Sequence, residues 1–248
     1  MARDVSFDTL WNGALSSGQG LTPALLDGLP ENVQRYLKHA IAPGTPLAAA
    51  VRLQMHGEIK LKDWCPFTAE QIICRDGDMI WRASVRMHGM PIRGHDRLID
   101  GVGNMQWKLF GLIPIMRASG PDITRSTAGR VAAEYVWLPS ALCGGKAAWS
   151  ASDDARAHAK LATEGEATNL TICVDPKGRL EQVLTERWGN PEGEGFHYAG
   201  FGGMVDEEGS FDGYTIPTRL RVGWYPHGRQ FENDGEFFRV IVDHAQFR

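Results

Sequence analysis

The chain has 248 residues, of which 43% are hydrophobic and 23% charged, and its formal net charge is −4 at pH 7. This composition is typical of a globular protein with a sizeable core, and the acidic balance without runs of Lys or Arg argues against a nucleic-acid partner. No apolar run approaches the ~20 residues that cross a bilayer, and the first residues lack an apolar secretory segment, so we expect a cytoplasmic protein without membrane insertion.

The first part of the chain lacks a regular pattern of apolar residues. We therefore predict a loosely structured N-terminal arm over residues 1–22, followed by a single domain over residues 23–248. Two short helices are expected next, one near 23–26 and one from Pro30. The second carries an apolar stripe at i, i+4 and i+8, which predicts a face packed on the core. This stripe consists of Val33, Leu37 and Ile41.

Alternation of apolar and polar residues then predicts two runs of antiparallel strands with a helix between them. The first run covers 51–62, 68–74, 78–87, 95–100 and 104–110. The helix is expected over 122–138, with Asp122 as its N-cap and Pro139 beyond its end. The second run covers 146–153, 156–162, 168–174, 179–187, 196–205, 214–225 and 235–247.

This order of elements predicts an α+β fold, mainly β, in which one continuous curved antiparallel sheet carries helices on one side. The glycine-rich stretch at 200–203 lacks the strand–loop–helix setting of a phosphate site, so we predict a flexible rim loop that could act as a lid. Exposed edges of an open sheet would also favour a homodimer.

Several stretches occur in the order of a known protein family. They are LPENVQRYLKHAI, WCPFTAEQ, IRGHDRLIDGVGNMQWKLFGLIPI, SGPDITRSTAGRVAAEYVWLPSAL and YTIPTRLRVGWY, which span roughly residues 29–245. The chain thereby resembles a family of bacterial proteins of unknown function, the DUF6544 (formerly DUF6920) family. The family is similar to lipoprotein-carrier folds, which implies an open half-barrel with helices in or across its concave face and an apolar cavity.

The resemblance also draws attention to particular residues of this chain. They are Asp96, Asp100, Arg125, Glu134, Trp137, Pro139 and Arg219. One departure concerns the start of the helix, because many relatives carry an acidic residue directly after the position of Arg125. This chain has Ser126 and Thr127 there, which weakens any transfer of a role to this end of the helix.

The helix over 122–138 brings together side chains that could do chemistry. Arg130, Glu134 and Trp137 share one face at i, i+4 and i+7. One interpretation is an exposed ion pair; the other is a face that lines the cavity, where Glu134 would be partly desolvated and its pKa raised. In the second case Glu134 is a candidate catalytic residue, and Arg125, Arg130 and Trp137 are candidates for binding the substrate.

A second group of candidates lies on the strand over 91–100. Alternation places Asp96 and Asp100 on the face of an apolar residue, which predicts that both point inward, towards arginines such as Arg82 or Arg219. The alternatives are a structural network of ion pairs and an acid–base pair that acts on a bound substrate. In the second case Asp96 is a candidate catalytic residue, and Asp100 and Arg219 are candidates for binding the substrate. His95 lies on the other face and is a candidate general base because its ordinary pKa is near neutral.

Aromatic residues are numerous, with eight Trp, ten Phe and five Tyr. Most must be core, but Trp81 and Trp107 are candidates for stacking on a flat aromatic or lipid-like ligand. The four cysteines show no CxxC spacing and the histidines no HExxH motif, so we expect neither a metal nor another cofactor.

Two functions of different classes fit such a cavity. The first is a cytoplasmic, cofactor-independent enzyme that uses acid–base catalysis on a small hydrophobic or aromatic metabolite, most concretely a lyase in aromatic catabolism and otherwise a hydrolase. The second is a non-catalytic carrier or sensor of a lipid or another lipophilic ligand, for which we expect an apolar cavity without buried charge. The candidate charges and the lack of an export signal favour the enzyme.

Overall fold

A computed structural model describes residues 5–145, 147–163, 166–228, 230–232 and 234–248. Three helices precede the sheet: α1 (Phe7–Gly13), α2 (Pro23–Leu26) and α3 (Glu31–Ala40). Helix α1 was not predicted; the Ser6 hydroxyl caps it by accepting a hydrogen bond from the Thr9 N–H at 3.1 Å. Its Phe7 and Leu10 pack on the convex face of the sheet, outside the main core.

Helix α3 matches its prediction closely. Val33 and Leu37 are fully buried and Ile41, which follows the helix, is nearly so. The apolar stripe faces the core, as its spacing requires. Pro30 is the N-cap rather than a residue of the first turn.

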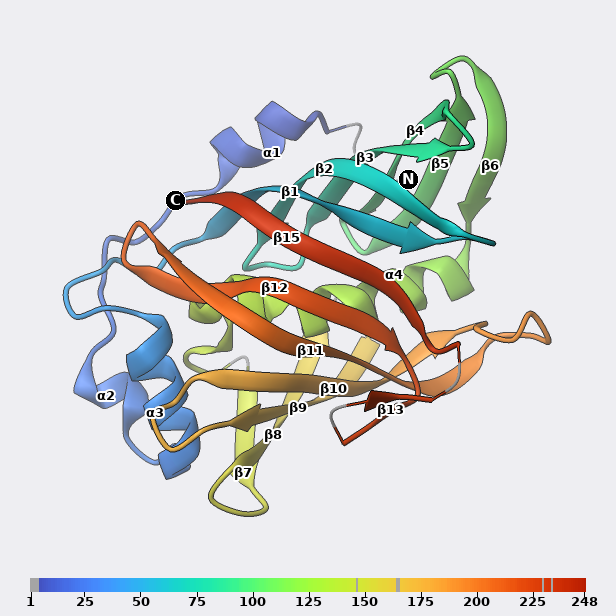
Figure 1. The fold of residues 1–248 in the computed structure, drawn as a ribbon. Helices are drawn as coiled ribbons and strands as arrows, with labels where there is room; N and C mark the ends of the chain where they lie inside the picture. Colours follow the sequence, from blue (N-terminus) through green and yellow to red (C-terminus); the bar gives the residue numbers. More distant parts are fainter. Residues whose placement is uncertain (1–4, 146, 164–165, 229, 233) are drawn as a thin grey trace.

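Thirteen strands form a single sheet within the described residues, and every neighbouring pair is antiparallel (Figure 1). The first six strands are β1 (Ala50–Lys60), β2 (Trp64–Cys74), β3 (Met79–Met87), β4 (Met90–Ile99), β5 (Val102–Leu109) and β6 (Ile113–Ser119). The other seven are β7 (Ala147–Ala151), β8 (Arg156–Thr163), β9 (Glu166–Val174), β10 (Leu180–Gly189), β11 (His197–Phe211), β12 (Tyr214–Trp224) and β15 (Glu236–Phe247). A separate ribbon consists of β13 (Pro226–His227) and β14 (Gln230–Phe231).

The order of the strands explains where the helix between the two runs must lie. The sheet runs β6-β5-β4-β3-β2-β1-β15-β12-β11-β10-β9-β8-β7, so β6 and β7 are its two opposite edges. The chain passes from one edge to the other through α4 (Pro121–Glu134) and two short 3-10 turns, η1 (Tyr135–Trp137) and η2 (Pro139–Leu142). The sheet curls around this connection, which packs on its concave face (Figure 1).

The predicted fold class is confirmed: a mainly β α+β fold with a curved antiparallel half-barrel around a helix. Three local predictions are wrong. Strand β6 was not predicted, Asp122 lies in the first turn of α4 while Gly120 is the N-cap, and residues 200–203 lie inside β11. Backbone packing explains the last case, because a Cβ on Gly202 would lie 2.4 Å from the carbonyl oxygen of Val183 on β10. Gly202 therefore allows close contact between the two strands, and the stretch forms no rim loop.

None of the helices in the described part of the chain is long and apolar enough to cross a membrane.

Candidate functional site

A cavity of about 310 Å³ lies between α4 with η1 and the concave face of the sheet. Its volume is at the lower end of the ~300–1,000 Å³ that is typical of small-molecule sites. Most of its lining is aromatic or aliphatic and comes from both halves of the sheet. These residues are Ile59, Trp81, Met105, Ala133, Val136, Trp137, Val183, Phe201, Gly203, Leu220, Val222, Trp224, Phe237 and Phe238. The remaining lining residues are all charged: Asp96, Arg130, Glu134 and Arg187.

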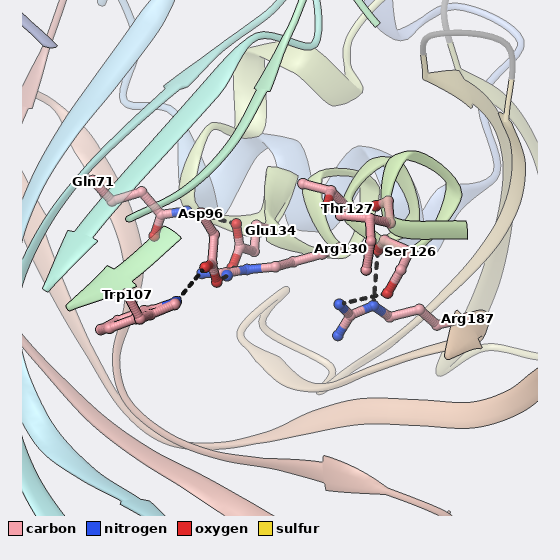
Figure 2. A network of polar contacts seen from close by, with 9 residues as sticks. Gln71, Asp96, Trp107, Ser126, Thr127, Arg130, Glu134 and Arg187 are labelled. Atoms are coloured by element: carbon pink, nitrogen blue, oxygen red, sulfur yellow. Dashed lines mark hydrogen bonds and ion pairs between the residues drawn. The ribbon is translucent and has the colours of Figure 1, made fainter. Parts of the chain in front are cut away.

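Three of the charged side chains form one closed cluster beside α4, which we call the ion-pair cluster: Asp96, Arg130 and Glu134. The Arg130 Nε donates to Glu134 Oε1 at 2.7 Å, one helical turn away, and Nη1 donates to Asp96 Oδ2 at 3.0 Å. The side chains are only 9–16% exposed. The cluster therefore ties α4 to β4 (Figure 2).

Two further donors complete the ion-pair cluster. The Trp107 Nε1 donates to Asp96 Oδ1 at 3.0 Å, and Gln71 Nε2 donates to Glu134 Oε2 at 2.6 Å (Figure 2). Each carboxylate oxygen thus accepts a hydrogen bond from a protein donor. Buried charges are tolerated when they are paired and hydrogen-bonded in this way.

The pKa values in the ion-pair cluster follow from burial and pairing. Burial raises the pKa of Asp96 above its ordinary value, although Arg130 and the indole hydrogen bond of Trp107 act in the opposite direction. Burial alone would lower the pKa of Arg130, but Glu134 and Asp96 outweigh it and the pKa is raised. Arg130 therefore carries its charge throughout the neutral range.

The opposite wall of the cavity carries a cation in a different setting. Arg187 comes from β10; its Nε donates to the carbonyl oxygen of Ser126 at 3.0 Å and its Nη2 to the Ser126 hydroxyl at 3.2 Å (Figure 2). Its guanidinium lies 4.6 Å from the ring centre of Phe201 and 5.3 Å from that of Trp224. Within the described ranges, Arg187 forms no ion pair. Burial, followed by repulsion from Arg130, lowers its pKa to about 10.

The structure brings five of the predicted site residues to the cavity and one directly behind it. Asp96, Arg130 and Glu134 form the ion-pair cluster, and Trp81 and Trp137 line the cavity. Trp107 lies outside the lining and acts through its hydrogen bond to Asp96. The Trp137 ring is held by its Nε1, which donates to the carbonyl oxygen of Pro217 at 3.0 Å.

Four other predicted site residues lie away from the cavity. Asp100 is exposed in the turn after β4, where its φ of +50° ends the alternation on which its inward placement rested. His95 lies on the opposite face of β4 from Asp96, and burial lowers its pKa. Arg219 is half exposed and pairs with Glu207 at 3.2 Å. The predicted pairing of Asp96 with Arg82 or Arg219 is therefore wrong, because its partner is Arg130.

The fourth, Arg125, belongs to a separate cluster near the start of α4. Its Nε donates to Glu166 at 3.2 Å, its Nη2 donates to the Tyr198 hydroxyl at 2.8 Å, and its guanidinium lies 3.8 Å from the ring centre of Trp188. Trp188 in turn donates its indole N–H to Asp122 at 2.9 Å. None of these side chains lines the cavity.

Arg187 was missed from the sequence, although a usable signal was present. Val183, Thr185 and Arg187 alternate along β10, so the arginine continues a face whose first two members are buried. The alternation that predicts an inward Asp96 also predicts an inward Arg187. A charged residue on an apolar strand face is informative wherever it occurs.

Comparison with known proteins defines the family. A model of a family of unknown function, DUF6920, matches residues 27–247, so the chain belongs to this family and the predicted resemblance is confirmed. No curated protein matches the sequence.

Two similar solved structures have been described as lipoprotein-sorting or LolA proteins. One is a putative outer membrane lipoprotein-sorting protein domain from Vibrio parahaemolyticus: identity is 8%, coverage is 81% of this chain and 86% of that one, and the TM-score is 0.42. The other is a LolA superfamily protein from Nitrosomonas europaea, with 8% identity, coverage of 88% and 92%, and a TM-score of 0.45.

The predicted acid–base enzyme, most concretely a lyase of aromatic catabolism, is wrong. The geometry supplies the physical reason: Asp96 and Glu134 are both held by Arg130 and by a second donor, and His95 faces away from the cavity. A general base must point towards the substrate proton, whereas these carboxylates are oriented by the donors of the protein itself.

Proposed function

We propose that this member of the DUF6920 family binds a lipophilic ligand in the cavity between α4 and the sheet and acts as a non-catalytic carrier or sensor. One observation carries the proposal: most of the cavity lining is apolar, and the carboxylates of Asp96 and Glu134 are paired with Arg130 inside the ion-pair cluster. The sequence predicted a carrier cavity without buried charge, and the structure corrects this point, because the ion-pair cluster and Arg187 line the cavity. Removing apolar surface from water is the main source of affinity for such a ligand. An aromatic ligand and a homodimer, both suggested by the sequence, stay predictions.

The ion-pair cluster has a structural role in this proposal. It joins α4 to β4 through Asp96 and to β2 through the hydrogen bond between Glu134 and Gln71. An empty apolar cavity tends to collapse, because its lining atoms lack contacts on one side. A buried network that holds α4 above the sheet keeps the cavity open. This role requires carboxylates that stay paired and exchange no proton with a ligand.

Intrinsic fluorescence provides the test, because Trp81, Trp137 and Trp224 line the cavity. We would titrate the protein with two ligand panels, fatty acids with their alcohols and small phenols, and recover each bound ligand for mass spectrometry. The proposal expects saturable binding and a ligand recovered unchanged. The absence of saturable binding across both panels, or a chemically converted ligand, would overturn it.

A variant that fills the cavity locates the binding. Ala133 lies on α4 and lines the cavity, so Ala133→Phe should reduce binding at least 10-fold. Ala148 is exposed on β7, so Ala148→Phe is the matched control and should bind like the wild type. Near-ultraviolet circular dichroism on both variants shows whether the fold is kept. Equal binding by both folded variants would place the ligand elsewhere and contradict the proposal.

A further inference from the structure

The donors of Arg187 are only partly used. A guanidinium has five N–H groups; in the described structure two of them, on Nε and Nη2, reach the Ser126 carbonyl and hydroxyl oxygens, and the other three meet no acceptor. Phe201 and Trp224 fix the plane of the group. The free N–H groups belong to the outer fork, which is the part that binds a carboxylate or phosphate in a bidentate manner.

Protein carboxylates do not satisfy this cation. Asp96 and Glu134 raise the pKa of Arg187 through space, but burial and Arg130 outweigh them. Neither carboxylate can turn towards Arg187 without giving up the donors that it already has. A partly desolvated cation on an apolar wall is costly unless another anion joins it.

We propose that the ligand is an amphipathic anion, whose carboxylate or phosphate headgroup pairs with Arg187 while its apolar part occupies the cavity. This inference rests on the proposed function and adds the chemical class of the ligand. The headgroup takes the outer fork of Arg187, next to Ser126 at the start of α4. The tail lies along Val222, Phe237 and Phe238, which line the same cavity. Neutral and cationic lipids of the same length bind more weakly.

Three matched ligands test the headgroup: dodecanoate, dodecyl phosphate and dodecanol, which share one chain. They are titrated by fluorescence against the wild type and Arg187→Gln, in which a shorter, neutral polar side chain replaces the cation. We expect the wild type to bind at least one of the two anions at least 10-fold more tightly than the alcohol. Arg187→Gln should lose this preference and bind the alcohol within twofold of the wild type. The two anion arms distinguish a carboxylate from a phosphate headgroup.

The outcomes separate this inference from the proposed function. Equal affinity of the wild type for anions and alcohol would overturn the anionic headgroup and leave the lipophilic ligand standing. A preference that persists in folded Arg187→Gln would overturn the assignment to Arg187. If the wild type binds neither these ligands nor any member of the two panels, the proposed function fails as well.

A second surface carries an independent inference. The β5–β6 hairpin lies at one edge of the sheet (Figure 1). Its tip exposes a group of large apolar side chains. They are Phe110, Leu112, Ile113, Ile115 and Met116, which are 49–79% exposed. Phe110 has a φ of +54°, a conformation that a bulky residue adopts only under strain. Unprotected apolar edge strands are normally avoided, so this tip points to a partner surface.

Charge identifies the kind of surface. The chain as a whole carries a net charge of −4, yet residues 101–120 contain Lys108 and Arg117 and no acidic residue. Arg93 on β4 adds a third cation, since its side chain lies beside Gly111 in the turn. In the part of the chain that the structure describes, Arg93 and Lys108 form no ion pair. Exposed apolar side chains with cations on the same hairpin and the neighbouring strand match an anionic lipid surface, which attracts basic groups by about 1 kcal/mol each.

We infer that the β5–β6 hairpin docks the protein on an anionic membrane. Sedimentation with vesicles of phosphatidylglycerol and phosphatidylcholine, against phosphatidylcholine alone, tests this. The wild type should bind only the anionic vesicles, and Leu112→Ser/Ile113→Ser should reduce binding at least fivefold. Leu15→Ser is the matched control, because Leu15 is equally exposed in a different region. Equal binding of the wild type to both kinds of vesicle would overturn the inference. A wild type that binds neither vesicle, but forms a dimer by light scattering that Leu112→Ser/Ile113→Ser loses, would also overturn it.

Discussion

The two walls of the cavity hold the same type of side chain in opposite electrostatic states. On the α4 side, Arg130 lies between Asp96 and Glu134, and its pKa is raised. On the β10 side, Arg187 is held by neutral oxygens of Ser126, and its pKa is lowered to about 10. Burial of a charge therefore does not by itself reveal its role. The first arginine serves the fold, whereas the second is available to a ligand.

The largest expected effect comes from breaking the ion-pair cluster. Arg130→Met leaves Asp96 and Glu134 buried without their cation, which should lower the free energy of unfolding by about 3–5 kcal/mol. Urea denaturation followed by circular dichroism measures this. The variant Asp96→Asn/Arg130→Met/Glu134→Gln, in which no charge of the cluster remains, should recover much of the loss. If Arg130→Met alone is as stable as the wild type, the ion-pair cluster does not stabilise the fold.

A smaller loss should follow from removing the donor behind Asp96. Trp107→Phe keeps an aromatic ring but leaves Asp96 Oδ1 without its indole partner, which should cost about 1–3 kcal/mol. The free energy of unfolding, again from urea, provides the measurement. Trp149→Phe is a matched control, because that indole donates to the backbone oxygen of Leu142 and is remote from the charges. If Trp107→Phe costs no more than the control, the hydrogen bond to Asp96 contributes little.

Substitution of Arg187 should raise the free energy of unfolding, in contrast to substitution of Arg130 or Trp107. Arg187→Met removes an unpaired, largely enclosed cation and leaves an unbranched apolar side chain in its place, so the ligand-free protein should gain about 1 kcal/mol of stability. Binding sites often carry such a stability cost for the sake of function. The measurement is the urea midpoint of ligand-free protein. Destabilisation comparable to Arg130→Met would contradict the proposed difference between the two walls.

How much of this site was predictable depended on the range of each interaction. Helical spacing placed Arg130, Glu134 and Trp137 together, and alternation turned Asp96 inward, since both periodicities act over a few residues. The partnership between Arg130 and Asp96 was not predictable, because it depends on how α4 crosses the sheet. Alternation misplaced Asp100, since the turn after β4 reverses the backbone there.

The fold itself was easier to predict than the site. Two runs of alternating strands around one helix leave few arrangements other than a single curved sheet. Strand β6 could not be predicted in this way, because residues 113–116 are continuously apolar and exposed and therefore lack alternation. Its pattern makes sense only if another surface covers it.

The smallest expected effect is a pH dependence of the free energy of unfolding, which comes from Asp96 on the α4 side of the cavity and not from Arg187. Burial raises the pKa of Asp96 above the ~3.9 of an unfolded chain, so the folded state binds this proton more tightly than the unfolded state does. The resulting stabilisation is fully present below the unfolded pKa and is lost as pH rises through the folded pKa.

Asp96→Asn should therefore remove the stabilisation that comes from protonated Asp96. As pH rises from acid towards neutral, the wild type should lose stability relative to this variant. The loss should be less than about 1.4 kcal/mol per unit of pKa shift. Urea denaturation of both proteins between pH 3 and 7 measures it. Arg187→Met serves as the control, because the ordinary and folded pKa values of Arg187 both lie far above this range. Its stability difference from the wild type should stay constant there. If the stabilities of wild type and Asp96→Asn depend on pH in the same way, pairing with Arg130 fully offsets the effect of burial on the pKa of Asp96. The charges of the ion-pair cluster would then be fully compensated, in contrast to the unpaired charge of Arg187.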